Sequence, residues 1–196
     1  KRLQLLPTSC LTIINYCVKI KTSFNCTRRN KMETQEIPGV TFKCRIDGDW
    51  QDVTTEDLFA GKRVGIFSLP GAFTPTCSST HLPGYEAHYE ELKEAGLDEV
   101  YCVSVNDSFV MNAWCKDQGV TKVKVIPDGN ATFTAGMGMV TTFKNRGFGQ
   151  RSWRYSAVID NKIVEKMWVE PNMTEDSDPD PFEVSNAETM LEYLKS

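Results

Sequence analysis

Residues 64–77 read VGIFSLPGAFTPTC, and this stretch changes from the pattern of a strand to that of a helix. Val64–Leu69 is a short apolar run, which is typical of a central strand. A turn follows directly, and the pattern is helical from about residue 75 to residue 95, with a kink at Leu82 or Pro83 and a stop at Gly96. We therefore expect Cys77 in the first turn of a helix that follows a central strand.

Strands and helices alternate on both sides of this segment. Further strands are expected at 40–46, 50–53, 100–105, 123–126, 153–159 and 163–169, and further helices at 54–58, 108–118 and after a capping box at Ser185–Glu188. The order β-α-β-α-β followed by β-β-α is typical of the α/β class. It predicts a thioredoxin-like fold, with a central mixed sheet flanked by helices.

Residues 1–31 differ from the rest in composition. They hold seven Lys or Arg and no Asp or Glu, and they are followed by Met32, which can start a chain in its own right. Such a stretch is typical of a mitochondrial transit peptide, and equally of translated upstream sequence. We expect a basic leader at 1–31, disordered or targeting, and one thioredoxin-like domain at 32–196.

The rest of the chain is acidic, because 15 of the 22 basic residues stand there against all 26 acidic ones. Nucleic acid is not an expected partner, since phosphate binding needs clustered positive charge. No apolar run approaches the roughly 18 residues that cross a membrane, so no membrane partner is expected either.

The cysteine pattern argues against metal binding and against structural disulfides. No pair among the seven cysteines is spaced C-x-x-C, and His81 and His88 are the only histidines, so no metal is expected. Scattered single cysteines are typical of a reducing compartment. The expected location is therefore intracellular and cytoplasmic, or mitochondrial if residues 1–31 are a transit peptide.

The residues around Cys77 favour a reactive thiolate. Unpaired backbone N–H groups and the helix dipole stabilise a negative charge in the first turn of a helix. The thiolate is the nucleophilic form of cysteine. Thr74 can place its hydroxyl beside the sulfur, and Pro70 stiffens the loop. From the residues alone, a buried structural cysteine is an equally good interpretation, since free Cys is among the most buried residue types.

The spacing Pro70-x-x-x-Thr74-x-x-Cys77 resembles the active-site signature of the peroxiredoxin family. The longer string PGAFTPTCSSTHLPGY at 70–85 resembles its peroxiredoxin-5 subfamily, and the similarity extends over roughly residues 36–195. The last part is similar to the peroxiredoxin part of peroxiredoxin–glutaredoxin fusions. The later matches include VSVND at 103–107, GFG at 147–149, RSWRYS at 151–156 and DPFEVS at 180–185.

The resemblance implies a thiol peroxidase that reduces hydrogen peroxide and alkyl hydroperoxides and serves cell redox homeostasis. It implies that Cys77 is the peroxidatic nucleophile, that Thr74 orients peroxide and sulfur, and that Pro70 shields the site. It also implies that Arg154 reaches the site from a later strand, where a planar guanidinium can hold both peroxide oxygens. A homodimer without a bound cofactor is implied as well.

Three other side chains near these positions are weaker candidates. Arg151 matches the signature less well and is expected to be a surface or supporting charge. His81 is either a cation that stabilises the thiolate or a histidine whose hydrogen bonds are satisfied, and we favour the second. His88 is expected on a solvated helix face.

The sulfenic acid that peroxide leaves on Cys77 must be reduced by a thiol. Some peroxiredoxins carry a resolving cysteine in the loop that corresponds to residues 170–182, and this loop has none here. Cys102 matches the spacing of plant-type members, but it lies in the apolar strand at 100–105, so its role as a resolving thiol is the weaker alternative. The expected reductant is external: glutathione with a glutaredoxin, or thioredoxin.

Other classes of function are less compatible with this pattern. A non-enzymatic redox sensor or chaperone-like binding protein would need Cys77 but neither turnover nor Arg154. A dithiol oxidoreductase is disfavoured because C-x-x-C is missing. A cysteine hydrolase would need a base with an orienting Asn or Asp around His81, and no such signature is present.

Overall fold

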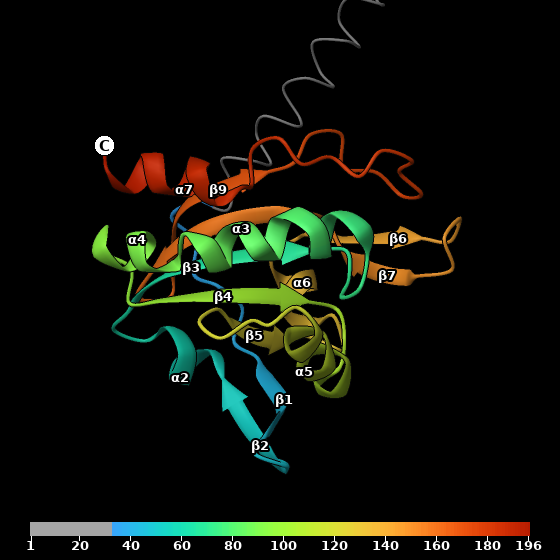
Figure 1. The fold of residues 1–196 in the computed structure, drawn as a ribbon, viewed down its shortest axis with the longest axis horizontal. Coiled ribbons are helices and arrows are strands. Elements are labelled where there is room, and N and C mark those ends of the chain that lie inside the picture. The colour runs from blue at the N-terminus through green and yellow to red at the C-terminus, as the bar shows by residue number, and fades with distance from the viewer. Residues whose placement is uncertain (1–32) are drawn as a thin grey trace, which may run out of the picture.

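The computed structural model describes residues 33–196, so the expected leader at 1–31 lies outside the described part of the chain. Its centre is a five-stranded sheet in the order β5-β4-β3-β8-β9 (Figure 1). Strands β3, β4 and β5 run parallel, whereas β8 and β9 run antiparallel to their neighbours. The predicted mixed sheet is confirmed. The strands are β3 (Arg63–Leu69), β4 (Glu99–Ser104), β5 (Lys124–Pro127), β8 (Tyr155–Asp160) and β9 (Ile163–Val169).

Helices cover one face of the sheet, where α3, α4 and α7 lie together (Figure 1). Phe67 and Leu69 of β3 point to this face and pack in one core cluster with Leu82, Trp114 and Met190. The helical elements of this face are η1 (Cys77–His81), α3 (Leu82–Ala87), α4 (Tyr89–Glu94), α5 (Ser108–Asp117) and α7 (Ala187–Leu194).

The opposite face packs against shorter elements. Val64 and Ile66 alternate with the residues of the first face, as a strand requires, and join a second core cluster with Phe42, Phe59 and Phe133. These rings come from β1 (Thr41–Ile46), α2 (Thr55–Phe59) and α6 (Thr132–Gly136). Strand β2 (Asp49–Thr54) pairs with β1, and β6 (Val140–Phe143) with β7 (Gly149–Ser152).

Strand β3 sits in the middle of the sheet and positions the site. A Cβ at Gly65 would lie 2.8 Å from Leu97 Cδ1 and 3.0 Å from Met190 Sδ, so the glycine lets α7 approach the strand closely. In the antiparallel register Ser68 pairs with Tyr155. Arg154, one residue before Tyr155, is thereby brought to the carboxyl end of β3, where the loop to Cys77 begins.

The structure corrects several sequence predictions. The helix expected at 75–95 is not continuous: it contains a π-turn and breaks at His88, which has φ −91° and ψ 6°. The last helix is capped by Asn186, whose side chain accepts from Thr189 N, and not by Ser185. Helix α6 and the β6–β7 hairpin were not predicted. Within residues 33–196, no helix is both long enough and apolar enough to cross a membrane.

Candidate active site

The loop that leaves β3 places Cys77 in the first turn of a helix, as predicted. The first i→i−4 bond runs from Ser78 N to Thr74 O (3.0 Å), so the Cys77 N–H precedes the regular hydrogen bonding. The side chain of Cys77 is fully buried. Cys77 also begins the π-turn, in which Leu82 N donates to the Cys77 carbonyl. π-Turns insert one residue into a helix and are frequent at functional sites.

A side chain from the neighbouring strand holds the loop. Asn106, just beyond β4, accepts with Oδ1 from Ala72 N (3.0 Å) and from the Ser104 hydroxyl (2.8 Å). Because the parallel strands β3 and β4 end at the same edge of the sheet, this amide can tie their two loops together.

Thr74 and Pro70 lie in the same tight loop. The Thr74 hydroxyl donates to Gly71 O (2.8 Å), so its oxygen lone pairs stay available for another donor. Pro70 is buried. Phe73 has a left-handed φ of 62°, a strained conformation for a bulky side chain. The loop therefore holds Thr74 and Cys77 in one defined arrangement.

Arg154 reaches Cys77 from the start of β8, the antiparallel neighbour of β3. Its side chain is 1% exposed, and Nη1 donates to Cys77 Sγ over 3.6 Å. Burial opposes the positive charge, but Cys77 and Asp180 outweigh it, so the pKa of Arg154 is raised. A permanently charged, buried guanidinium thus faces the sulfur.

His81 lies fully buried beside this guanidinium. Its Nδ1 accepts from Arg154 Nη1 (3.0 Å), which leaves Nε2 to donate to Ser185 O (3.1 Å). Burial, and then the charge of Arg154, hold the pKa of His81 well below its usual value. The ring is therefore neutral, and the alternative that His81 is a cation is wrong. It is a satisfied histidine, as we favoured, but its partner is Arg154.

Asp180 binds the remaining end of Arg154. Both carboxylate oxygens accept from Nη2, at 2.5 and 2.6 Å. The Phe182 ring lies 4.9 Å from the His81 ring and 5.7 Å from the Arg154 guanidinium carbon. The segment 180–185 therefore covers the site with a carboxylate, an aromatic ring and the carbonyl that binds His81.

Glu170, immediately after β9, holds this segment in place. Its carboxylate belongs to a residue that is 1% exposed. It accepts from the backbone N–H groups of residues 183–185 and from the Ser185 hydroxyl, at 2.7–3.0 Å. The loop at 170–182 thus begins with a buried, fully hydrogen-bonded carboxylate.

Arg151 has the supporting role that we expected. Its Nη1 donates to Val105 O (2.6 Å) and its Nε to Phe148 O (3.2 Å), so it links backbone segments and does not face the sulfur. His88 is half-buried on the surface, next to Glu91 and Glu188.

The thiols of the other described cysteines are not activated for nucleophilic attack. Cys102 lies in the same core cluster as Cys77, and burial raises the pKa of its thiol well above the usual value. Burial raises the pKa of Cys115 to about 11, and burial followed by Asp52 raises that of Cys44. Each of these thiols is therefore protonated near neutral pH.

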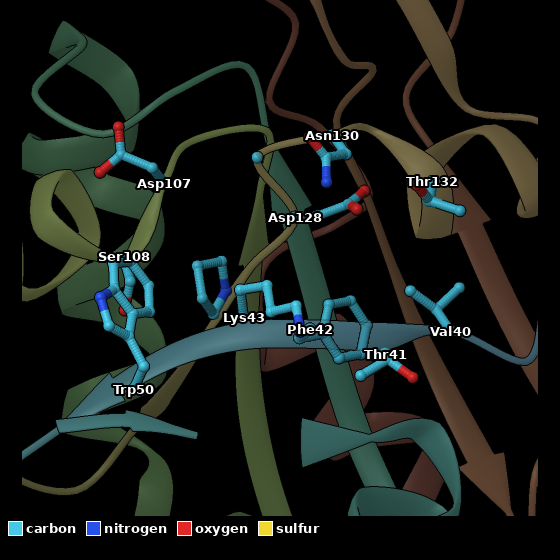
Figure 2. A pocket seen from close by; sticks show the side chains of 12 residues that line it. Val40, Thr41, Phe42, Lys43, Trp50, Asp107, Ser108, Asp128, Asn130 and Thr132 are labelled. Atoms are coloured by element: carbon cyan, nitrogen blue, oxygen red, sulfur yellow. The ribbon is translucent and has the colours of Figure 1, made fainter. Parts of the chain in front are cut away.

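A separate cavity of about 270 Å³ lies between β1 and the turn after β5 (Figure 2). Its buried carboxylate, Asp128, accepts from the backbone N–H groups of Phe133 and Thr134 in α6, and Asp107 caps α5. Neither Cys77 nor Arg154 lines this cavity, so it is not the candidate active site. Its other lining residues are Val40, Thr41, Phe42, Lys43, Trp50, Ser108, Pro127, Gly129, Asn130 and Thr132.

Comparison with known proteins places this geometry in a family. Residues 32–191 match the family model described as Redoxin. A peroxiredoxin of Synechocystis is 50% identical over 173 residues, which cover 84% of this chain and 92% of that protein. The hybrid peroxiredoxin hyPrx5 of Haemophilus influenzae is 53% identical over 165 residues, which cover 84% of this chain and 67% of that protein.

Solved structures of peroxiredoxins are also similar to this chain. The reduced Prx3 of Vibrio vulnificus in complex with hydrogen peroxide has a TM-score of 0.74 and 40% identity, covering 83% of this chain and 98% of that one. The Plasmodium falciparum antioxidant protein, a 1-Cys peroxiredoxin, has a TM-score of 0.80 and 37% identity over the same shares. The chain therefore belongs to the redoxin family. Within it the chain is a peroxiredoxin, a thiol peroxidase with a thioredoxin-like fold and no prosthetic cofactor.

Sequence reasoning missed three parts of the site: the anchor Glu170, the carboxylate of Asp180, and the contact between His81 and Arg154. Each is a contact between residues far apart along the chain, which leaves no periodic pattern. The one available signal was the DPFEVS stretch at 180–185, which the family resemblance includes.

Proposed function

We propose that the Cys77 thiolate attacks hydrogen peroxide or an alkyl hydroperoxide. The sulfur bonds to the terminal peroxide oxygen, which keeps its hydrogen, the O–O bond breaks, and the departing hydroxide or alkoxide takes up one net proton from the buffered solvent. Cys77 is thereby oxidised to a sulfenic acid and the peroxide is reduced to water or an alcohol. The observation that carries this proposal is the 3.6 Å contact between Arg154 Nη1 and Cys77 Sγ in a buried site.

Arg154 stabilises the transition state in this mechanism. Negative charge moves from the sulfur to the departing oxygen during the attack, and a fixed guanidinium compensates it at both positions. The Nε–H of Arg154 is buried and has no acceptor among residues 33–196, so the guanidinium is not saturated.

Thr74 and Pro70 prepare the substrate side of the site. The free lone pairs of the Thr74 hydroxyl can accept the peroxide O–H, which orients the O–O bond toward Cys77. Pro70, at the start of the same loop, is buried and shields the sulfur from water.

For the second half of the cycle we propose glutathione with a glutaredoxin as the reductant, with thioredoxin as the alternative. Glutathione condenses with the sulfenic acid to a mixed disulfide and water, and glutaredoxin then attacks this disulfide and releases the Cys77 thiolate. Two observations support an external thiol: the loop at 170–182 has no cysteine, and the Cys102 thiol is buried and protonated.

The names of two relatives support the proposal of an external thiol. One is named a hybrid peroxiredoxin, and another is a 1-Cys peroxiredoxin. Both proposed donors belong to reducing compartments, so we place the protein in the cytoplasm, or in mitochondria if residues 1–31 are a transit peptide.

We also propose that the protein is a homodimer. The family resemblance is the main support. In addition, the rings of Trp50 and Phe109 are 57% and 58% exposed and lie 5.5 Å apart, and exposed apolar patches mark interaction surfaces. Sedimentation in reducing buffer is expected to show a dimer at micromolar concentration, and a monomer would contradict this.

Steady-state peroxide reduction tests the proposed function. We expect turnover with glutathione plus glutaredoxin that exceeds turnover with thioredoxin and its reductase, and no turnover in C77S. Activity that survives in C77S would refute the role of Cys77. Faster turnover with thioredoxin would refute the proposed reductant only.

A further inference from the structure

We propose that Asp180 is a positioning residue: it directs the Arg154 guanidinium toward Cys77 and competes with the Cys77 thiolate for its positive charge. This inference rests on the proposed role of Cys77 as nucleophile. It concerns a carboxylate from a loop 26 residues away from Arg154 in sequence.

The orienting effect follows from how the donors of Arg154 are divided. Nη2 is bound by both oxygens of Asp180, at 2.5 and 2.6 Å. Nη1 donates to His81 Nδ1 at 3.0 Å and to Cys77 Sγ at 3.6 Å. Because the guanidinium is planar, an anchor at Nη2 and a second at His81 fix the direction of Nη1. Asp180 is thus the anchor at the end opposite the sulfur.

The competition follows from the count of charges. His81 is neutral, so a single cation, Arg154, lies between two anions, the Cys77 thiolate and the Asp180 carboxylate. Each anion therefore reduces the electrostatic stabilisation that Arg154 gives to the other anion. Once Cys77 is a neutral sulfenic acid, Arg154 and Asp180 form a balanced pair. Without Asp180, the buried positive charge of Arg154 would have no counter-ion in the oxidised state.

The position of Asp180 suits this role. Its side chain is 26% exposed, whereas that of Arg154 is 1% exposed. Phe182, two residues later, covers both His81 and Arg154, and Glu170 holds the rest of the segment. The carboxylate is therefore kept against the guanidinium by its own segment and stays accessible to water.

The test compares D180N with D178N in the full chain. Asn has the shape of Asp without its charge. Asp178 is an exposed residue of the same loop, and it is its backbone carbonyl that binds Arg146. For each variant, iodoacetamide alkylation of Cys77 across pH gives the midpoint of thiolate formation. Stopped-flow mixing with hydrogen peroxide, at a pH where Cys77 is fully ionised, gives the rate constant of oxidation.

Two changes are expected in D180N and neither in D178N. The thiolate-to-thiol ratio at a fixed pH rises by about threefold to tenfold, because the competing anion is gone. The rate constant with fully ionised Cys77 falls by about tenfold or more, because Arg154 is no longer directed at the sulfur. A loop that only supported the fold would not produce more thiolate together with slower oxidation.

Several outcomes would overturn the proposal. If the midpoint of Cys77 thiolate formation in D180N is unchanged or lies at higher pH, Asp180 does not compete with the thiolate. If D180N oxidises within twofold of the wild-type rate, Asp180 does not orient Arg154. If D180N fails to fold, D180E decides: it keeps the carboxylate, so the wild-type midpoint is expected, and a displaced midpoint refutes the charge argument. If wild-type Cys77 itself does not react with peroxide, the proposed function fails instead.

Discussion

Replacing Arg154 by lysine keeps the positive charge but removes the planar fork. Lysine presents one nitrogen, whereas Arg154 uses Nη1 toward Cys77 and His81 and Nη2 toward Asp180. An ammonium that stays with the Asp180 carboxylate cannot also face the sulfur and the peroxide. The substitution therefore removes a directed donor without removing the charge from the core.

The size of the effect follows from the donor that is lost. Removing one fixed donor from a developing negative oxygen costs about 2.7–4 kcal/mol of transition-state stabilisation. Since about 1.36 kcal/mol corresponds to a factor of ten, the oxidation rate of Cys77 should fall by about 10²–10³-fold. The loss of the two Nη1 hydrogen bonds, to Cys77 and to His81, costs about 1–3 kcal/mol of stability each, and we expect the variant still to fold.

Stopped-flow fluorescence measures this rate. Trp114 donates to Ser78 Oγ (3.0 Å), one residue from Cys77, so its emission should report the oxidation. R146K is the matched control, because Arg146 is exposed and its Nη2 donates to the Asp178 carbonyl and not to Cys77. The reasoning would be refuted by a folded R154K variant that oxidises within threefold of wild type.

Three further predictions concern other parts of the account. Only the unfolded chain readily protonates His81, so this residue should lower the free energy of unfolding by up to about 1.4 kcal/mol for each pH unit below about 6.5. H81Q should lack this contribution, and urea unfolding of wild type and H81Q at several pH values measures it. E170Q should lose about 2–4 kcal/mol of unfolding free energy, since it breaks bonds to a buried carboxylate, whereas the exposed E175Q should not. A chain that starts at Met32 and keeps Cys77 as its only cysteine should retain turnover with glutathione and glutaredoxin within a few-fold. If that turnover collapses and restoring Cys102 recovers it, an internal disulfide is required.

The strand, the loop and the first helical turn at 64–77 could be predicted because their signals are local. The apolar run of β3, the prolines and the stop at Gly96 each act within a few residues. The helix expected at 108–118 also has a local signal, because Asp107 directly before it caps its first turn. The register of β8 on β3, which brings Arg154 to Cys77, is not local, and only the family resemblance pointed to this arginine.

The parts that were missed depend on packing. The π-turn at Cys77–His81 has no residue pattern of its own, and the sequence indicated only a kink just after it, at Leu82 or Pro83. The predicted cap of the last helix was Ser185, but its hydroxyl donates to Glu170, and Asn186 caps the helix. An acidic loop normally suggests a solvated surface, yet tertiary contacts bury Glu170 and pair Asp180 with Arg154.

The central claim is that Cys77 is the thiol that reacts with peroxide. The direct measurement is to treat the reduced protein with one equivalent of hydrogen peroxide in the presence of dimedone, which traps sulfenic acids, and to map the adduct by mass spectrometry. We expect close to one adduct per chain, on Cys77, with Cys102 and Cys115 unlabelled. An adduct that falls mainly on another cysteine, with Cys77 left as a free thiol, would contradict the account.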